Sequence, residues 1–464
     1  MESFRFRKTP WRRLAWSPVF GAALFAGLWL YAMAPYEIEL PLSEDIVIEP
    51  QAERFRCLAV NCEGVPQPPP IEVLGNPAAA RYPECHQAFA RNPWDLVAHE
   101  GRLFIGLGDE SNSGPSANAG PVPVLALDLS SGKFFQESIL DEEQVERFYA
   151  EEDALWVPGA DPRQSWRLGN LYRRGQESHW TKLRTLPQAI HTHALAWHNG
   201  ALYAGLTATK VVPNGLGTER WGSAIARSSD GGSHWEFIPL GGLRLFEFIK
   251  VADHLYATDI FPEPAANTWL NKQGREGTHA PIYELLETGV FQRRLDLDAL
   301  ALFPDTPLAG LRSAIIDRAV SWGERAAYLG LFSALKDSAP VQSAYIAAHL
   351  DRGNIEVRRI PLPEKAVAFD LLTKGEQLFV LFSEPQATND WVNEVWSSHD
   401  GHRWTSIIRF SAQNPARSFE KVGDDWYFGL GSLSPPKSDH CTLQDEVTGT
   451  LLRIHGSEPH TKSP

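Results

Sequence analysis

A pair of large apolar residues recurs along this chain and limits what the chain can fold into. In each copy a short apolar stretch leads to a tight polar turn, and a second apolar stretch carries the pair. The pairs are Leu103-Phe104, Leu155-Trp156, Leu202-Tyr203, Leu255-Tyr256, Ala327-Tyr328, Leu378-Phe379 and Trp426-Tyr427. They are separated by 52, 47, 53, 72, 51 and 48 residues. Repeats of about 40–50 residues built from short strands are typical of a β-propeller.

Each hairpin supplies the two inner strands of one blade, so the chain is predicted to be an all-β, seven-bladed propeller over residues 95–464. Six or eight blades are the alternatives. The composition agrees, since 16 Trp, 36 Gly and 34 Pro against 2 Met favour a β-rich, turn-rich chain. The last repeat has only three strands, and its polar tail is too short for a fourth. Because an open propeller edge must be covered, residues 71–74, before the first blade, are expected to supply that strand.

A polar turn ending in tryptophan occurs twice, as "SSDGGSHW" at Ser228–Trp235 and "SHDGHRW" at Ser398–Trp404. A degenerate third copy keeps only Trp180. Each turn follows the third strand of its repeat and precedes the fourth. The Ser and Asp side chains can accept hydrogen bonds from backbone N–H groups in the turn, and the glycines permit positive φ angles. The tryptophan is expected to pack between adjacent sheets.

These turns resemble the Asp-box (BNR) repeat, Ser-x-Asp-x-Gly-x-x-Trp, of sialidases and the sortilin ectodomain. "SHDGHRW" departs from the pattern by being one residue short. The resemblance covers residues 95–455 as architecture. It implies that the boxes join third and fourth strands on the face away from the ligand, with a structural role.

The N-terminus carries a separate signal. Residues 1–13 include five basic side chains, and residues 14–34 contain no charge, which predicts a transmembrane anchor with the N-terminus in the cytoplasm. A cleaved signal peptide is the alternative, because Ala32-Met33-Ala34 has the small-x-small form. The long apolar run and Pro35 after the cut argue against cleavage. Residues 35–94, which contain "PQPPP", are predicted to form a Pro-rich stalk that ends in the closing strand.

The net charge and the cysteines limit where the protein can be located in the cell and which partners it can have. Beyond the basic tail the chain carries a net charge near −18, which excludes nucleic acid as a partner. The absence of Asn-x-Ser/Thr sequons fits a bacterial inner-membrane protein whose C-terminal domain lies in the periplasm, or a secreted protein if the leader is cleaved. The cysteine spacing does not match a zinc site, and exported cysteines usually pair. Candidates for disulfides are Cys57, Cys62, Cys85 and Cys441. A Cys57–Cys62 bond would close a small loop, and a Cys85–Cys441 bond would join the two ends of the propeller.

The loops between second and third strands are mostly long, and strand alternation places them on one face of the disc. We therefore expect the binding surface there, over the mouth of the central channel. The candidate residues are Asp109, Arg147, Asp161, His191, His193, Asp259, Arg312 and Arg417. His191 and His193 suit a metal ion or a proton-transfer pair, and no other cofactor is expected. Asp95, Glu247 and Asp370 recur at one register and are expected to form a solvated ring.

The predicted function is a binding or assembly module for a protein or polysaccharide. The alternative is a sialidase-like glycoside hydrolase or lyase acting at the channel mouth. Sialidases use an Arg-Ile-Pro motif near the first blade and a Tyr/Glu nucleophile pair. In this chain Arg359-Ile360-Pro361 lies in an outer strand of the fifth blade, and no Tyr/Glu pair can be picked out. The chain also has no Gly-x-Ser-x-Gly elbow and no His-Glu-x-x-His helix.

Overall fold

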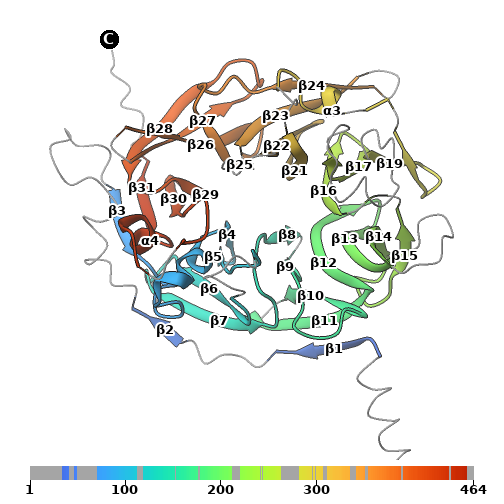
Figure 1. Ribbon diagram of the computed structural model, residues 1–464, viewed down its shortest axis with the longest axis horizontal. Coiled ribbons are helices and arrows are strands. Elements are labelled where there is room, and N and C mark those ends of the chain that lie inside the picture. The colour runs from blue at the N-terminus through green and yellow to red at the C-terminus, as the bar shows by residue number, and fades with distance from the viewer. Residues whose placement is uncertain are drawn as a thin grey trace, which may run out of the picture. The chain divides into compact units, whose positions relative to one another are not determined.

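The computed structural model contains seven β-sheets, which follow one another around a ring (Figure 1). Within the compact unit of residues 37–464, each sheet is one blade, so the prediction of seven blades is confirmed. The described residues are 34–40, 46–49, 71–111, 119–151, 153–175, 178–211, 220–240, 242, 244–262, 282–294, 296–297, 299–306, 311–334, 341–350, 354–387, 390–437 and 440–456.

Every blade is built on four antiparallel strands that succeed one another from the channel outward, and three of the sheets have a fifth, short strand at one edge. Blade 1 has β4 (Asp95–His99), β5 (Arg102–Gly106), β6 (Val122–Asp128) and β7 (Phe134–Leu140). Blade 2 has β8 (Tyr149–Glu151), β9 (Ala154–Pro158), β10 (Leu168–Arg174) and β11 (Trp180–Pro187). Blade 3 has β12 (Ala189–His198), β13 (Ala201–Val211), β14 (Arg220–Ser228) and β15 (Glu236–Pro239). Blade 4 has β16 (Leu245–Val251), β17 (His254–Asp259), β19 (Ile282–Leu285) and β20 (Phe291–Arg293).

The remaining blades follow the same order. Blade 5 has β21 (Leu311–Trp322), β22 (Arg325–Ala334), β23 (Val341–Leu350) and β24 (Asn354–Arg359), and the short β18 (Phe261–Pro262) pairs with β21. Blade 6 has β25 (Val367–Lys374), β26 (Gln377–Pro385), β27 (Trp391–Ser398) and β28 (Thr405–Ala412). Blade 7 has β29 (Ala416–Val422), β30 (Asp425–Leu430), β31 (Leu451–His455) and β3 (Ile71–Gly75). The short helices are η1 (Cys85–Arg91), α3 (Ala299–Leu302) and α4 (Leu443–Val447).

The paired apolar residues all lie on the second strand of their blade, as predicted, and their adjacency has a physical reason. Neighbouring residues of a strand point to opposite faces of its sheet. Leu202 therefore packs in the interface with blade 2, and Tyr203 packs in the interface with blade 4. In blade 6 the pair divides in the same way between two hydrophobic clusters. One apolar pair per repeat thus fills the interfaces on both sides of a blade.

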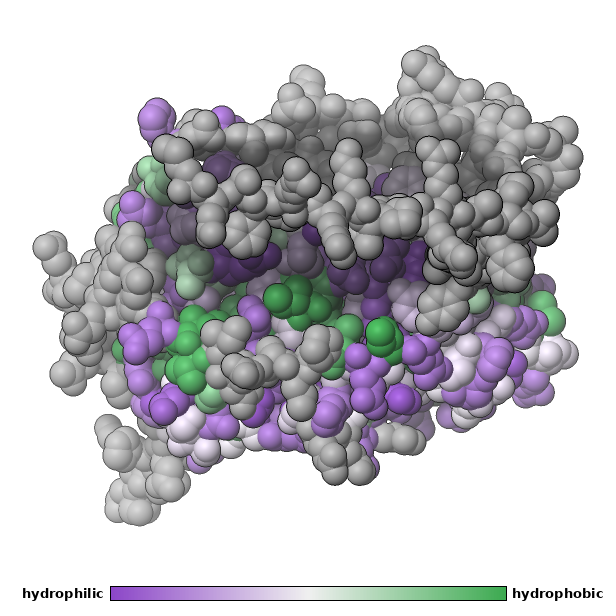
Figure 2. All heavy atoms as spheres, turned by 90° about the horizontal axis from the view of Figure 1, so that it is seen from below, coloured by the Kyte–Doolittle hydropathy of each residue, from purple (hydrophilic) through white to green (hydrophobic). Residues whose placement is uncertain are grey.

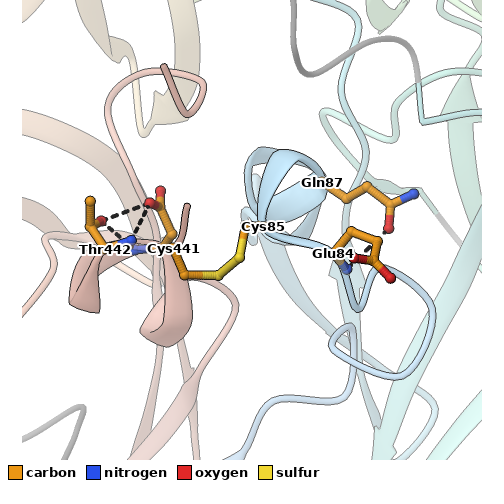
Figure 3. Close-up of a disulfide and its surroundings, with 6 residues drawn as sticks. Glu84, Cys85, Gln87, Cys441 and Thr442 are labelled. Atoms are coloured by element: carbon orange, nitrogen blue, oxygen red, sulfur yellow. Dashed lines mark hydrogen bonds between the residues drawn. A yellow bond between two sulfur atoms is a disulfide. The ribbon is translucent and has the colours of Figure 1, made fainter. Parts of the chain in front are cut away.

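The ring is closed by the N-terminal strand, as predicted. β3 pairs with β31 in register Ile71↔Ile454, and it supplies the fourth strand that the last repeat lacks. Nearby, Cys85 of η1 is bonded to Cys441, with the two Cα atoms 5.0 Å apart, so that disulfide prediction is also confirmed (Figure 3). Cys57 and Cys62 lie outside the described residues. The first and last parts of the propeller are therefore joined by both a β-ladder and a covalent bond.

The predicted stalk is wrong for two of its described segments. β1 (Tyr36–Glu39) extends blade 2 beyond β11, and β2 (Ile46–Ile48) extends blade 1 beyond β7. Both sheets end in an outer strand whose edge offers backbone donors and acceptors, and these short segments satisfy them. Figure 2 views this side of the molecule and shows apolar side chains gathered among polar ones. Residues 36–39 and 46–48 are thus part of the blades.

The predicted anchor, residues 14–34, falls almost entirely outside the described residues. Across the part of the chain that the structure describes, no helix is long and apolar enough to cross a membrane.

Both tryptophan-ended turns connect third and fourth strands and have the predicted hydrogen bonds. The Ser228 hydroxyl accepts from the Gly232 N–H at 2.8 Å, and Asp230 Oδ1 accepts from the His234 N–H at 3.0 Å. In the second turn, Asp400 Oδ1 accepts from two backbone N–H groups, each at 2.8 Å. Trp235 packs into the interface with blade 2, so this turn fastens one blade to its neighbour.

Candidate functional site

The strand order fixes which connections share a face of the disc. Because all seven blades have the same antiparallel order, every loop between second and third strands lies on one face, which we call the loop face. The turns between first and second strands and the tryptophan-ended turns lie on the opposite face, the turn face. Inner strands therefore run from the loop face to the turn face. Much of four long loops, residues 112–118, 212–219, 263–281 and 335–340, lies outside the described residues.

Five inner strands carry a β-bulge close to the loop face. In blade 5, Ile316 pairs with Gly330 and Arg318 with Leu329, so Asp317 is the extra residue. The same shift occurs in blades 3, 4, 6 and 7. A bulge re-aims one side chain without ending the ladder. The extra residues at these shifts, which we call the bulge residues, are His193, Phe246, Asp317, Phe369 and Arg417. β12 and β21 each have one further shift nearer the strand start, at Ile190 and Arg312.

Three of the bulge residues, Asp317, Phe369 and Arg417, line a cavity of about 170 Å³ in the channel, which we call the upper cavity. Its other charged lining residues are Glu146, Arg147 and Arg318. Of the seven predicted site residues whose side chains the structure describes, Arg147 and Arg417 line this cavity.

A layer of ion pairs closes the channel beneath the upper cavity. The Arg318 guanidinium donates to Asp95 at 2.9 Å and to Asp370 at 2.5 Å, which joins blade 5 to blades 1 and 6. Arg147 pairs with Glu247 and also donates to the Asp317 carbonyl at 2.8 Å, which joins blade 2 to blades 4 and 5. We call these five residues the arginine partition: Asp95, Arg147, Glu247, Arg318 and Asp370. Glu247, Arg318 and Asp370 each follow a bulge residue directly. Asp95 and Arg147 take the equivalent place in blades 1 and 2.

The expectation of a solvated acidic ring is therefore wrong. Asp95, Glu247 and Asp370 are buried and paired with arginine. Each also accepts a backbone N–H from the following blade; Asp95, for example, accepts from Phe148 at 2.8 Å. Burial raises the pKa of Asp370 to about 7, against the opposing charge of Arg318. A buried carboxylate needs such partners, so these residues connect blades.

Arg417 has a different environment from the two partition arginines. Its guanidinium lies 4.4 Å from the Trp94 ring centroid and donates to the Ser432 carbonyl at 2.9 Å. Burial lowers its pKa to about 10, while Asp317 and Glu146 oppose that shift. Arg417 is a cation held on an aromatic face, a pair of residue types common in the energetic centres of interfaces.

An acidic group adjoins the upper cavity on blades 1 and 2. Burial raises the pKa of Glu146 to about 8, and nearby Glu110 and Asp317 add to the shift. Burial also raises the pKa of Glu110 to about 7 and of Glu143 to about 8. Asp109 is buried and accepts from the Ser111 N–H at 2.8 Å. Several of these carboxyl groups therefore hold protons near neutral pH.

His191 and His193 stack on each other, with ring centroids 5.4 Å apart. Nδ1 of His191 lies 3.7 Å from Glu110, and Nε2 of His193 lies 2.8 Å from the Thr207 hydroxyl. Burial lowers the pKa of His191 to about 4 and holds the pKa of His193 well below its usual value, so both rings are neutral at pH 7. Among the described residues, no group of three or more His, Cys, Asp or Glu could hold a metal ion.

Asp161 and Asp259 are not among the residues that line the upper cavity. Asp161 accepts from the Trp166 indole N–H at 3.0 Å. Asp259 is buried and accepts from the backbone N–H groups of Arg244 and Ile260. Arg312 is the second residue of β21, and its side chain is not among those that the structure describes.

Sequence reasoning missed Arg318, Asp317, Glu146 and Trp94. Arg312 was chosen because it follows the start of the fifth repeat's first strand. β21, however, has 12 residues and two register shifts, which place the channel residue six positions later. The repeat intervals could have found it, because Arg318 stands 71 residues after Glu247, close to the interval of 72 between the apolar pairs.

Comparison with family models and with curated proteins found no match. Among solved structures, the chain is similar to the WD40 repeats of RRP9 (9% identity, TM-score 0.43, covering 78% of this chain and 94% of that one). It is also similar to the extracellular domain of a putative hybrid two component system from B. thetaiotaomicron, with 10% identity and a TM-score of 0.41, over 80% of this chain and 41% of that one. A prolyl endopeptidase is similar with 13% identity and a TM-score of 0.39, over 76% of this chain and 50% of that one. The chain spans half or less of the last two. Function therefore has to be inferred from the geometry of the site.

Proposed function

We propose that the protein is a binding or assembly module whose loop face takes a protein or polysaccharide ligand. In this proposal residues 14–34 anchor it in a bacterial inner membrane and the propeller faces the periplasm. We also assign it to the Asp-box propeller superfamily. The hydrogen bonds of the two tryptophan-ended turns and their place between third and fourth strands support that assignment.

The observation that carries the binding proposal is the closed channel. Pockets for drug-sized ligands usually measure about 300–1,000 Å³, whereas the upper cavity measures about 170 Å³. The arginine partition forms its floor, so a ligand cannot descend further into the channel. A ligand of the loop face would therefore contact a broad surface, with Arg417 and Trp94 near its centre.

The alternative, a sialidase-like hydrolase or lyase, has one observation in its favour. Arg147, Arg318 and Arg417 all line one cavity, and three arginines suit a substrate carboxylate. Two of them are already paired with buried carboxylates that join blades. Binding a substrate through them would break contacts that hold the ring together, so the binding proposal is preferred.

The test is capture of partners from membranes of the native host by the full-length protein, with Arg417→Ala compared against Arg403→Ala. Arg403 is exposed on the turn face and serves as a matched control. Loss of the captured partner in Arg417→Ala alone would support the proposal. Equal capture by both variants would refute the assigned face. Hydrolysis of a fluorogenic sialoside by the wild type would establish the alternative instead.

The anchor is tested separately by mass spectrometry of the mature protein. An intact N-terminus in the membrane fraction supports it, and a mature chain that begins at Pro35 contradicts it.

A further inference from the structure

A second cavity, of about 260 Å³, lies on the other side of the arginine partition. Arg147 and Arg318 line both cavities, so the partition separates them. The residues that line this lower cavity continue the inner strands away from the loop face; on β4, for example, Leu96 and Val97 follow Asp95. Because inner strands run toward the turn face, the cavity lies on the turn-face side of the partition.

The walls of the lower cavity are mainly apolar, although a propeller channel is normally in contact with water. Six partly buried apolar side chains line it, from the inner strands of five blades. They are Val97, Tyr149, Trp197, Ala319, Val320 and Leu372. Concave apolar surface that remains exposed in a folded protein marks a ligand site more often than random surface.

The rings of Tyr149 and Trp197 form an angled aromatic wall in the lower cavity. The ring centroids of Tyr149 and Trp197 lie 6.2 Å apart at an interplanar angle of 48°, so the two faces are inclined to each other. The Tyr149 hydroxyl is held by Arg147 at 3.3 Å, which fixes the ring against the partition. Apolar cavities of about 150 Å³ bind benzene. The lower cavity therefore has room for a bicyclic aromatic ring.

Charges around the lower cavity disfavour an anionic ligand. Two arginines and two carboxylates of the partition line the cavity, and each arginine is already paired with a carboxylate. Glu151 and Glu420 also line the cavity, and Lys374 pairs with Glu420 at 2.9 Å. Carboxylates outnumber arginines and lysines here, so a ligand carboxylate would be repelled, whereas a neutral group or an ammonium would not.

We propose that the lower cavity is a second binding site, for a small aromatic molecule that is neutral or carries an ammonium group, with its ring against Tyr149 and Trp197. The site is independent of the proposed function, because it lies on the opposite face from the proposed partner surface and shares with it only the two partition arginines.

The test is isothermal titration calorimetry of the full-length protein in lipid nanodiscs, with empty nanodiscs subtracted. The three probes are indole, tryptamine and indole-3-acetate, which share one ring and differ in charge. Indole and tryptamine should bind saturably with dissociation constants below about 1 mM. Indole-3-acetate should bind at least about tenfold more weakly. No saturable binding of indole or tryptamine, or preference for the acetate, would overturn the proposal.

Two valine-to-tryptophan substitutions test in which of the two cavities tryptamine binds. Val97→Trp fills the lower cavity, whereas Val367→Trp makes the same change on β25 in the lining of the upper cavity. Val97→Trp should weaken tryptamine binding more than about tenfold, and Val367→Trp should change it less than about twofold. Equal effects, or loss only in Val367→Trp, would contradict the assignment.

A third variant covers the case in which Val97→Trp does not fold. Ala150 lines the lower cavity but is exposed on β8, so Ala150→Phe obstructs the cavity without changing the core. Normal tryptamine binding by a folded Ala150→Phe would refute the site. Retained partner capture on the loop face by the same variant would show that any loss concerns the lower cavity alone.

Discussion

Removal of Arg318 tests whether the arginine partition stabilises the ring. Arg318→Met keeps most of the side-chain length but removes the charge that Asp95 and Asp370 share. The variant should still fold, because Asp95 retains its bond from the Phe148 N–H and Asp370 retains those from the Phe419 and Leu371 N–H groups. It should be less stable, because two buried carboxylates lose their counter-ion.

The size of the effect follows from the contacts. Each charged hydrogen bond contributes about 1.5–3 kcal/mol, and breaking a buried ion pair costs about 3–5 kcal/mol. For the unit of residues 37–464 the unfolding entropy is on the order of 0.9 kcal/mol/K. The midpoint of thermal unfolding should therefore fall by about 3–6 °C. The assay is thermal unfolding followed by tryptophan fluorescence, with exposed Arg403→Met as the control, for which a change below about 0.5 kcal/mol is expected.

The pH dependence makes the test sharper. The pKa of Asp370 is already raised to about 7 with Arg318 in place. Because the positive charge of Arg318 lowers that pKa, the Arg318→Met substitution should raise it further. A carboxyl with a raised folded-state pKa stabilises the protein below its unfolded pKa, and this stability is lost as pH rises through the folded pKa. The destabilisation by Arg318→Met should therefore be larger at pH 8 than at pH 5. A loss no greater than in Arg403→Met, or a loss that shrinks as pH rises, would refute the reasoning.

Three further outcomes are expected. Cys85→Ser should lower the unfolding midpoint, because the disulfide closes a loop with a sequence separation of 356 residues, worth about 6 kcal/mol in the chain-entropy model; an unchanged midpoint with and without reductant would contradict this. Trp235→Ala should lower the free energy of unfolding by roughly 3 kcal/mol, the lower end of the range for a large side chain, because Trp235 is only partly buried. Partner capture on the loop face should be retained. Lost capture at unchanged stability would give the turn a binding role. The raised pKa values of Glu142 (about 7), Glu143 and Glu146 (both about 8) should make the wild type less stable as pH rises from 6 to 9, and Glu146→Gln should reduce that slope; a midpoint that rises over this range would show that these groups are ionised in the fold.

Features fixed by local pattern could be predicted from sequence. The apolar pairs located the second strand of every blade, and the three-stranded last repeat led to Ile71–Leu74 as the closing strand. Cys85 and Cys441 pair because ring closure brings the chain ends together. Short outer strands such as Ile46–Ile48 escaped prediction, since their pairing depends on an edge that exists only in the folded blade.

The candidate site was harder to predict for a geometric reason. A residue enters the channel mouth because a bulge shifts its strand by one position, and a bulge has no clear composition signal. Arg417 was found because it lies next to the strand start, whereas Asp317 lies inside the long strand β21. The acidic residues Asp95, Glu247 and Asp370 were placed at the right register, but their burial depends on Arg147 and Arg318, which reach them from other blades.

The bulge residues also bear on how such a protein can diverge. A bulge residue is left out of the register between its inner strand and the neighbouring strand. A change of side chain at Asp317, Phe369 or Arg417, the bulge residues that line the upper cavity, alters that cavity while the strand pairing on either side stays intact. Positions 317, 369 and 417 can therefore vary while the blades that carry them keep their strand order. Descendants of this chain could acquire new ligands by substitution at these positions alone, without rebuilding a blade.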